Sequence, residues 1–161
     1  MIVVVMGVSG SGKTTIGKLL ASELDWDFAD ADDFHPQANV QKMAAGIPLT
    51  DQDRAPWLQR LRQVIFERLS ANQNLVLACS ALKASYRELL AVDPEGMLFV
   101  YLKGSYELIA SRMLERKGHF MKEEMLKSQF DALEEPGGAF VVEISEEPSA
   151  IVKRIRQKLG A

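Results

Sequence analysis

The sequence is poor in the residues that form disulfides or bind transition metals. Its 161 residues include one cysteine and two histidines. The single cysteine, Cys79, can form no internal disulfide, so a reducing compartment, the cytoplasm, is the expected location. The two histidines, His35 and His119, are isolated and lack the spacing of zinc ligands. Disulfide scaffolds and zinc proteins are therefore not indicated.

Long apolar runs and an excess of positive charge are also absent. No stretch approaches the roughly 18 apolar residues of a membrane-spanning helix. The first apolar run, residues 2–6, is far shorter than the hydrophobic region of a secretory signal. The net charge is −3, whereas nucleic-acid binding needs a basic face. We therefore expect a cytoplasmic protein whose partners include neither membrane nor nucleic acid.

Glycine is concentrated near the N-terminus, in the segment Gly7-Val8-Ser9-Gly10-Ser11-Gly12-Lys13-Thr14. The segment fits the pattern G-x-x-x-x-G-K-S/T, and it lies between an apolar run and a helical pattern, as a phosphate-binding loop requires. Glycines let backbone N–H groups curl around an anion, and the next helix turns its positive end toward the phosphates. A chance match in a Gly/Ser-rich turn would lack that flanking strand and helix.

This loop predicts a bound nucleoside triphosphate, taken as ATP, with Mg²⁺. Lys13 can reach the β- and γ-phosphates, and the Thr14 hydroxyl can ligate the metal. The residues expected to contact the nucleotide are Gly7, Ser9, Gly10, Ser11, Gly12, Lys13, Thr14 and Thr15.

Short apolar runs alternate with helical patterns along the chain, which is typical of a parallel sheet with helices on both faces. Strands are expected at residues 2–6, 26–29, 75–79, 97–102 and 140–144. Helices are expected at residues 13–23, 36–45, from about 51, at 84–91, at 106–115, up to 133 and from 148. Asp51 or Asp53 is expected to cap the third of these helices. The fold class is three-layer α/β/α with a five-stranded parallel sheet, in one domain over residues 1–161.

A phosphate-binding loop does not by itself separate kinases from GTPases or motor ATPases. The chain has no Asn-Lys-x-Asp motif for guanine. Its third strand runs into Cys79-Ser80-Ala81 without the carboxylate typical of a hydrolytic ATPase. An acidic residue must therefore come from elsewhere, and the second predicted strand ends in Asp30-Ala31-Asp32-Asp33.

The carboxyl ends of parallel strands meet at one edge of a sheet, so this acidic run is expected beside the phosphate-binding loop. On an extended chain, Asp30 and Asp32 point the same way. One carboxylate can orient an acceptor hydroxyl or take its proton, and its neighbour can bind acceptor polar groups or water on Mg²⁺. We assign both residues to the acceptor, and Asp32 also to catalysis and to the metal. The alternative is a solvated acidic turn that caps the next helix.

Further motifs follow in order along the chain. They are Asp30-Ala31-Asp32-x-x-His35-Pro36-x-x-Asn39-x-x-Lys42-Met43, then Gly46-x-Pro48-Leu49-x-Asp51-x-Asp53-Arg54-x-Pro56-Trp57-Leu58, then Cys79-Ser80-Ala81-Leu82-Lys83-x-x-Tyr86-Arg87, then Arg116-Lys117-Gly118-His119-Phe120, then Ser128-Gln129-x-x-x-Leu133-Glu134-x-Pro136. Together they resemble the gluconate kinase family.

This resemblance implies a P-loop kinase fold, shared with shikimate and nucleoside monophosphate kinases. It also implies ATP-dependent phosphorylation of D-gluconate to 6-phospho-D-gluconate by a cytoplasmic homodimer. Two alternatives stay open: another small-molecule acid kinase of this fold, such as a shikimate kinase, and a nucleotide-binding switch without transferase activity.

Three cations and a histidine are candidate ligands of the acid. Arg54 is the leading clamp, because a guanidinium matches a carboxylate bidentately; its alternative is an ordinary salt bridge to a neighbouring aspartate. Lys83 and Arg87 lie four residues apart on one predicted helix face, which can equally be a solvated face. We expect His35 to bind the acceptor or order its loop, because a loose transition state leaves a base little to do.

The remaining cations cluster at Arg112, Arg116 and Lys117. In the fold that the resemblance implies, residues 116–124 form a mobile lid over ATP. The resemblance places Arg112 against the adenine ring and Arg116 or Lys117 near the phosphates, with Arg116 as a catalytic residue. A lid cation neutralises charge on the transferred phosphoryl group, and closure excludes water. The alternative is a helix end that carries cations at its favoured C-terminus.

Overall fold

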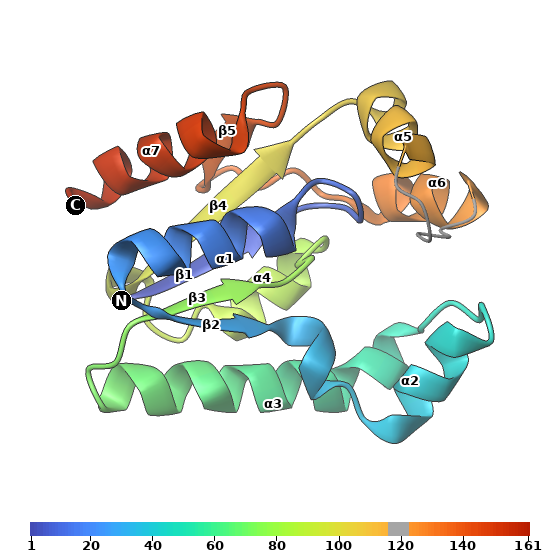
Figure 1. The fold of residues 1–161 in the computed structure, drawn as a ribbon. Helices are drawn as coiled ribbons and strands as arrows, with labels where there is room; N and C mark the ends of the chain where they lie inside the picture. The colour runs from blue at the N-terminus through green and yellow to red at the C-terminus, as the bar shows by residue number, and fades with distance from the viewer. Residues whose placement is uncertain (116–122) are drawn as a thin grey trace.

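The computed structural model describes residues 1–115 and 123–161. Five parallel strands form one sheet in the order β2-β3-β1-β4-β5 (Figure 1). The strands are β1 (Ile2–Met6), β2 (Asp27–Asp30), β3 (Leu75–Ala78), β4 (Met97–Lys103) and β5 (Phe140–Glu143). All residues of β1 and β3 are buried, as expected for strands covered on both faces. The predicted five-stranded parallel sheet is confirmed.

Helices cover both faces of this sheet (Figure 1). They are α1 (Lys13–Leu24), α2 (Gln37–Ala44), α3 (Asp51–Ser70), α4 (Ala84–Leu90), α5 (Tyr106–Glu115), α6 (Glu123–Ala132) and α7 (Pro148–Leu159). The predicted strands and helices are confirmed, with ends that differ by a residue or two. None of the helices in the described ranges combines the length and the apolar character that crossing a membrane requires.

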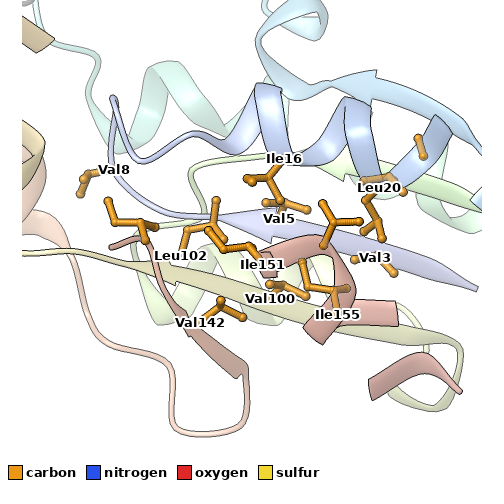
Figure 2. Close-up of a cluster of buried hydrophobic side chains, with 14 of the residues drawn as sticks. Val3, Val5, Val8, Ile16, Leu20, Val100, Leu102, Val142, Ile151 and Ile155 are labelled. Atoms are coloured by element: carbon orange, nitrogen blue, oxygen red, sulfur yellow. The ribbon is translucent and has the colours of Figure 1, made fainter. Parts of the chain in front are cut away.

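One apolar cluster lies on each face of the sheet, because alternate side chains of a strand point to opposite sides. Val3 and Val5 of β1 pack with Leu20 of α1 and Ile155 of α7, as Figure 2 shows. Ile2, Val4 and Met6 pack on the other face, against α3 and α4. The expected three-layer arrangement therefore follows directly from the alternation along the central strand.

The local chain differs from prediction at two helix starts. Thr50, and not Asp51 or Asp53, is the N-cap of α3: its hydroxyl accepts from Asp53 N at 3.1 Å, and Asp53 Oδ2 accepts from Thr50 N at 2.9 Å. Asp53 is therefore the third helical residue of a capping box. In addition, residues after β2 do not stay extended, because Ala31–Phe34 form a short 3-10 helix, η1.

The strands end on the side of the molecule where the loop between β1 and α1 lies, with α2 and the α5–α6 pair flanking that side (Figure 1). The predicted phosphate-binding loop and the acidic run after β2 therefore share one edge of the sheet. Two residues of the predicted lid, Arg116 and Lys117, lie outside the described residues.

Candidate active site

The loop between β1 and α1 has the backbone of an anion cradle. Gly10 and Gly12 adopt φ angles of +81° and +98°, in the left-handed region that favours glycine. The first α1 residue to form an i to i−4 bond is Ile16, whose N donates to Gly12 O at 2.8 Å. The N–H groups of Lys13, Thr14 and Thr15 precede it and have no partner within the helix, which leaves them for a phosphate.

The catalytic candidate Lys13 is held by the same loop. Its Nζ donates to Val8 O at 3.1 Å, and Ser11 N donates to that oxygen at 3.2 Å. Burial lowers the pKa of the Lys13 ammonium, while the charges of Asp32 and Asp30 oppose this shift. Among the described residues, the ammonium is therefore bound by the loop and close to both predicted carboxylates.

Asp30 faces the nucleotide side of the site. It ends β2, and its Oδ2 accepts a hydrogen bond of 3.1 Å from Thr14 Oγ1. Its Oδ1 accepts from Asp32 N at 3.0 Å, which caps η1. The predicted extended alternation of Asp30 and Asp32 is therefore wrong, because this cap turns the chain between them into a 3-10 helix.

Asp32 lies on the other side of the turn, with its side chain 81% exposed. Its Oδ1 is 3.9 Å from His35 Nε2. The surrounding protein limits the solvation of the carboxylate and, together with the Asp30 charge, raises the pKa of Asp32, whereas Lys13 lowers it. A raised pKa makes this carboxylate a better proton acceptor.

His35 is held by Trp57 at its ring face and by Asn39 at Nδ1. Its ring stacks on Trp57, with ring centroids 4.3 Å apart and planes at 14°. Its Nδ1 lies 3.2 Å from Asn39 Nδ2, which also donates to Asp53 O at 2.9 Å. Burial, and then the nearby Arg54 charge, lower the pKa of His35 and favour the neutral ring. These contacts support the predicted loop-ordering role; contact with an acceptor stays a prediction.

Arg54 and Lys83 meet around Tyr86, at the first turns of α3 and α4. Arg54 Nη1 donates to the Tyr86 hydroxyl at 3.2 Å, and that hydroxyl donates to Asp51. Lys83 Nζ donates to Asp51 Oδ1 at 2.9 Å. Both cations lie over the Tyr86 ring, the guanidinium carbon at 5.7 Å and the ammonium at 5.6 Å from its centroid. We call Asp51, Arg54, Lys83 and Tyr86 the acceptor-side cluster.

The predicted alternative for Arg54, a salt bridge to Asp51 or Asp53, is not what the described residues form. Asp51 pairs with Lys83, and Asp53 accepts from Lys42 at 2.9 and 3.0 Å. Sequence reasoning assigned no site role to Tyr86 and considered Asp51 only as a helix cap or a salt-bridge partner of Arg54. A usable signal was present, because Asp51 precedes Arg54, and Lys83 precedes Tyr86, by one helical turn.

Arg87 has a different environment from Lys83. Its Nη1 donates to Ala81 O at 2.7 Å and Leu82 O at 3.1 Å, and its Nη2 donates to Glu134 O at 2.7 Å. The guanidinium thus joins the loop after β3 to the segment after α6. The structure places Arg87 outside the acceptor-side cluster, although Arg87 and Lys83 were predicted to share one helix face.

Two residues link the α5–α6 region to the rest of the fold. Arg112 Nη2 donates to Ile144 O at 2.6 Å, which ties α5 to the end of β5. Gln129 of α6 binds Ser9 of the phosphate-binding loop twice, through Ser9 N to Oε1 at 2.7 Å and Nε2 to Ser9 Oγ at 3.0 Å. The role of Gln129 was not predicted, although it stands in the Ser128-Gln129 motif. No local sequence signal indicates a partner that lies 120 residues away.

The residues present can accommodate Mg²⁺ beside a nucleotide. In residues 1–115 and 123–161, no group of three or more His, Cys, Asp or Glu side chains is placed to hold a metal. Mg²⁺ with a nucleotide keeps several waters and binds phosphate oxygens, so it needs only one or two protein groups. The Thr14 hydroxyl and the Asp30 carboxylate in contact with it fit that requirement.

Comparisons with known proteins agree with this geometry. Residues 9–159 match the family model described as shikimate kinase. A probable gluconokinase of Xenopus tropicalis is 46% identical over 173 residues, covering 96% of this chain and 91% of its own. The thermoresistant gluconokinase of Escherichia coli K12 is 44% identical, covering 94% of this chain and 89% of its own.

Solved structures point to the same group. A gluconokinase from Sinorhizobium meliloti has a TM-score of 0.85 at 40% identity, covering 98% of this chain and 94% of its own. A shikimate kinase from Aquifex aeolicus, 19% identical with a TM-score of 0.60, shares the fold. The matching family model, the relatives and the phosphate-binding loop lead to one conclusion: the chain belongs to the gluconokinase family, within the shikimate kinase group of P-loop kinases.

Proposed function

We propose that this protein is a gluconokinase that transfers the γ-phosphoryl group of ATP to a hydroxyl of D-gluconate, forming 6-phospho-D-gluconate. The observation that carries the proposal is the acceptor-side cluster at the same sheet edge as the phosphate-binding loop, with Asp32 between them. The Arg54 charge influences His35, His35 Nε2 lies 3.9 Å from Asp32 Oδ1, and the Asp32 charge influences Lys13, so neighbouring groups connect the two halves.

On the nucleotide side, the loop N–H groups bind phosphate oxygens. The Lys13 ammonium has three donors, so it reaches the β- and γ-phosphates while it keeps its bond to Val8 O. Bound Mg²⁺ would neutralise phosphate charge, held by Thr14, with Asp30 binding its water. The sequence assigned the metal to Asp32; the Thr14 contact favours Asp30 instead. Arg112 against adenine, and Arg116 near the phosphates, stay predictions, the latter outside the described residues.

On the acceptor side, Asp32 orients the reacting hydroxyl and accepts its proton. Its raised pKa and its exposure suit a carboxylate that meets a substrate from solvent. Arg54 and Lys83 bind the gluconate carboxylate and nearby hydroxyls. Asp51, which now accepts from Lys83 and Tyr86, competes with the substrate carboxylate for the same donors. His35 orders the Asp32 turn, and Arg87 holds the loop that carries Lys83.

The family also suggests a cytoplasmic homodimer. Light scattering on the purified protein measures its mass in solution against the monomer value of 17.9 kDa. A monomer at working concentration would contradict the dimer without touching the proposed reaction.

An acceptor panel tests the proposed reaction. ADP release is measured with gluconate, shikimate, glycerate and nucleoside monophosphates, and gluconate is expected to give the highest kcat/KM. The control pair is Lys13→Ala, which should abolish turnover by removing phosphate stabilisation, and Lys18→Ala on the same helix, which should not. Turnover with another acid but not with gluconate would overturn the proposal. ADP release independent of any acceptor would indicate a switch.

A further inference from the structure

One peptide group of the phosphate-binding loop, between Val8 and Ser9, is hydrogen-bonded from both sides. Its carbonyl oxygen accepts from Lys13 Nζ at 3.1 Å and from Ser11 N at 3.2 Å. Its N–H, which belongs to Ser9, donates to Gln129 Oε1 at 2.7 Å. The carbonyl and the N–H of a trans peptide lie in one plane and point in opposite directions. The bond to Gln129 therefore sets the direction in which the Val8 carbonyl points.

The second bond from Gln129 removes the remaining rotation. Its Nε2 donates to Ser9 Oγ at 3.0 Å, so both ends of the side-chain amide bind the same residue. An amide that accepts from the backbone and donates to the side chain of one residue holds that residue in a single orientation. Ser9 is accordingly restrained from outside the loop.

The position of Gln129 is set independently of the loop. Leu126, one turn earlier on α6, is 2% exposed and belongs to the apolar cluster around β1. Phe130 packs edge-on against Tyr106 of α5, with ring centroids 5.5 Å apart. Because these apolar contacts fix the position of α6, they also fix the backbone position of Gln129, whose amide binds Ser9.

We propose that Gln129 is a positioning residue for phosphoryl transfer: it holds the Val8–Ser9 peptide so that the Val8 carbonyl points at Lys13. Without it, only the bonds from Lys13 and Ser11 to the Val8 carbonyl restrain the peptide plane. Rotation of the less restrained peptide would weaken the bond from Lys13 to Val8 O, and the lysine would lose its place beside Asp30 and Asp32. The effect on catalysis rests on the proposed function; the effect on the peptide does not.

Gln129→Met tests this proposal, because methionine has a similar length and helix propensity but forms neither bond. Amide hydrogen exchange, followed by NMR, is expected to show a protected Ser9 N–H in the wild type and a fast one in the variant. Exchange at the buried Leu77 should be unchanged and reports on folding. The activity arm should show kcat reduced about tenfold or more, as misplaced groups cause, with the gluconate KM unchanged.

The matched control is Gln63→Met. Gln63 lies on α3, and its Nε2 donates to Glu67 Oε1 at 3.1 Å on the exposed side of that helix. This variant should leave both Ser9 exchange and kcat as in the wild type. A second variant, Gln129→Glu, retains an oxygen for the Ser9 N–H and should keep Ser9 protected; it also covers the case in which Gln129→Met fails to fold.

Fast exchange of Ser9 in the wild type would overturn the inference, and so would lost protection in Gln129→Met with an unchanged kcat. The proposed function fails separately, since a wild type that does not phosphorylate gluconate can still show the exchange difference. Lost protection in Gln129→Glu would also contradict the assigned geometry.

Discussion

The Thr14 hydroxyl donates to the Asp30 carboxylate, with 3.1 Å between Oγ1 and Oδ2. This bond joins the first turn of α1 to the end of β2 and turns Asp30 toward the nucleotide. The same carboxylate caps η1, so the chain bends and carries Asp32 to the His35 side. Asp30 and Asp32, two positions apart in sequence, therefore face different parts of the site: Asp30 contacts Thr14, and Asp32 lies near His35.

The first prediction concerns this division. Asp32→Asn should lower kcat by about a hundredfold, since a positioned proton acceptor contributes on that scale, and should leave ATP affinity unchanged. Asp30→Asn should instead raise the Mg²⁺ concentration needed for half-maximal rate. Steady-state kinetics over a Mg²⁺ titration separates the two. A larger kcat loss for Asp30→Asn at saturating Mg²⁺ would reverse the assignment.

The second prediction concerns Arg54. Arg54→Ala should raise the KM for gluconate about tenfold to a hundredfold, as expected for a lost charge-assisted hydrogen bond, and should leave the KM for ATP unchanged. Arg62→Ala is the control, because Arg62 lies on the same helix and donates to Leu89 O at 2.6 Å. A selective rise in the KM for ATP would place Arg54 at the nucleotide.

The third prediction follows from the three carbonyls bound by Arg87. Arg87→Ala should lower the free energy of unfolding by about 2 kcal/mol, the scale of hydrogen bonds from a charged donor, measured in urea. Arg87→Lys should recover only part of it, since an ammonium lacks the planar fork. The KM for gluconate should change little. A large increase in the KM for gluconate with unchanged stability would indicate that Arg87 binds the substrate, as the sequence predicted.

The fourth prediction is a pH dependence of stability. Hydrogen bonds from Thr50 N and Lys42 lower the pKa of Asp53 to about 2 from an ordinary 3.8. Folding therefore favours the charged carboxylate. Its stabilisation is fully present above pH 3.8 and is lost as the pH falls toward 2. The unfolding free energies of wild type and Asp53→Asn should accordingly differ at pH 6 and approach each other as the pH falls to about 2.

Urea unfolding at several pH values checks this prediction. Thr50→Ser, which keeps the capping hydroxyl, is the control and should follow the wild type across the range. A difference between wild type and Asp53→Asn that stays constant down to pH 2 would show that the Asp53 charge does not contribute.

Much of the fold could be predicted because its signals are local. The apolar runs at β1 and β3 are buried on both faces and read as strands without knowledge of their neighbours. The cap of α3 was misassigned because Thr50, Asp51 and Asp53 are all good N-cap residues. Only the backbone angles at Thr50, which is extended, select one of them.

The site was predictable in its parts but not in its connections. Lys13, Asp30 and Arg54 were predicted from motif and chemistry, and their roles stay predictions. The partners of Arg87 and Gln129 lie up to 47 and 120 residues away in sequence. Such contacts depend on how the helices pack against the sheet, and residue spacing along the sequence does not predict that packing.

By itself, the sequence determined that this chain carries a phosphate-binding loop on a parallel α/β sheet, because glycine spacing and strand periodicity are short-range properties of the backbone. The tertiary structure alone decided which carboxylate meets Thr14, which cations gather around Tyr86 and what holds the Val8–Ser9 peptide. Those choices depend on directed hydrogen bonds between segments that only packing of the apolar faces brings within about 3 Å of each other.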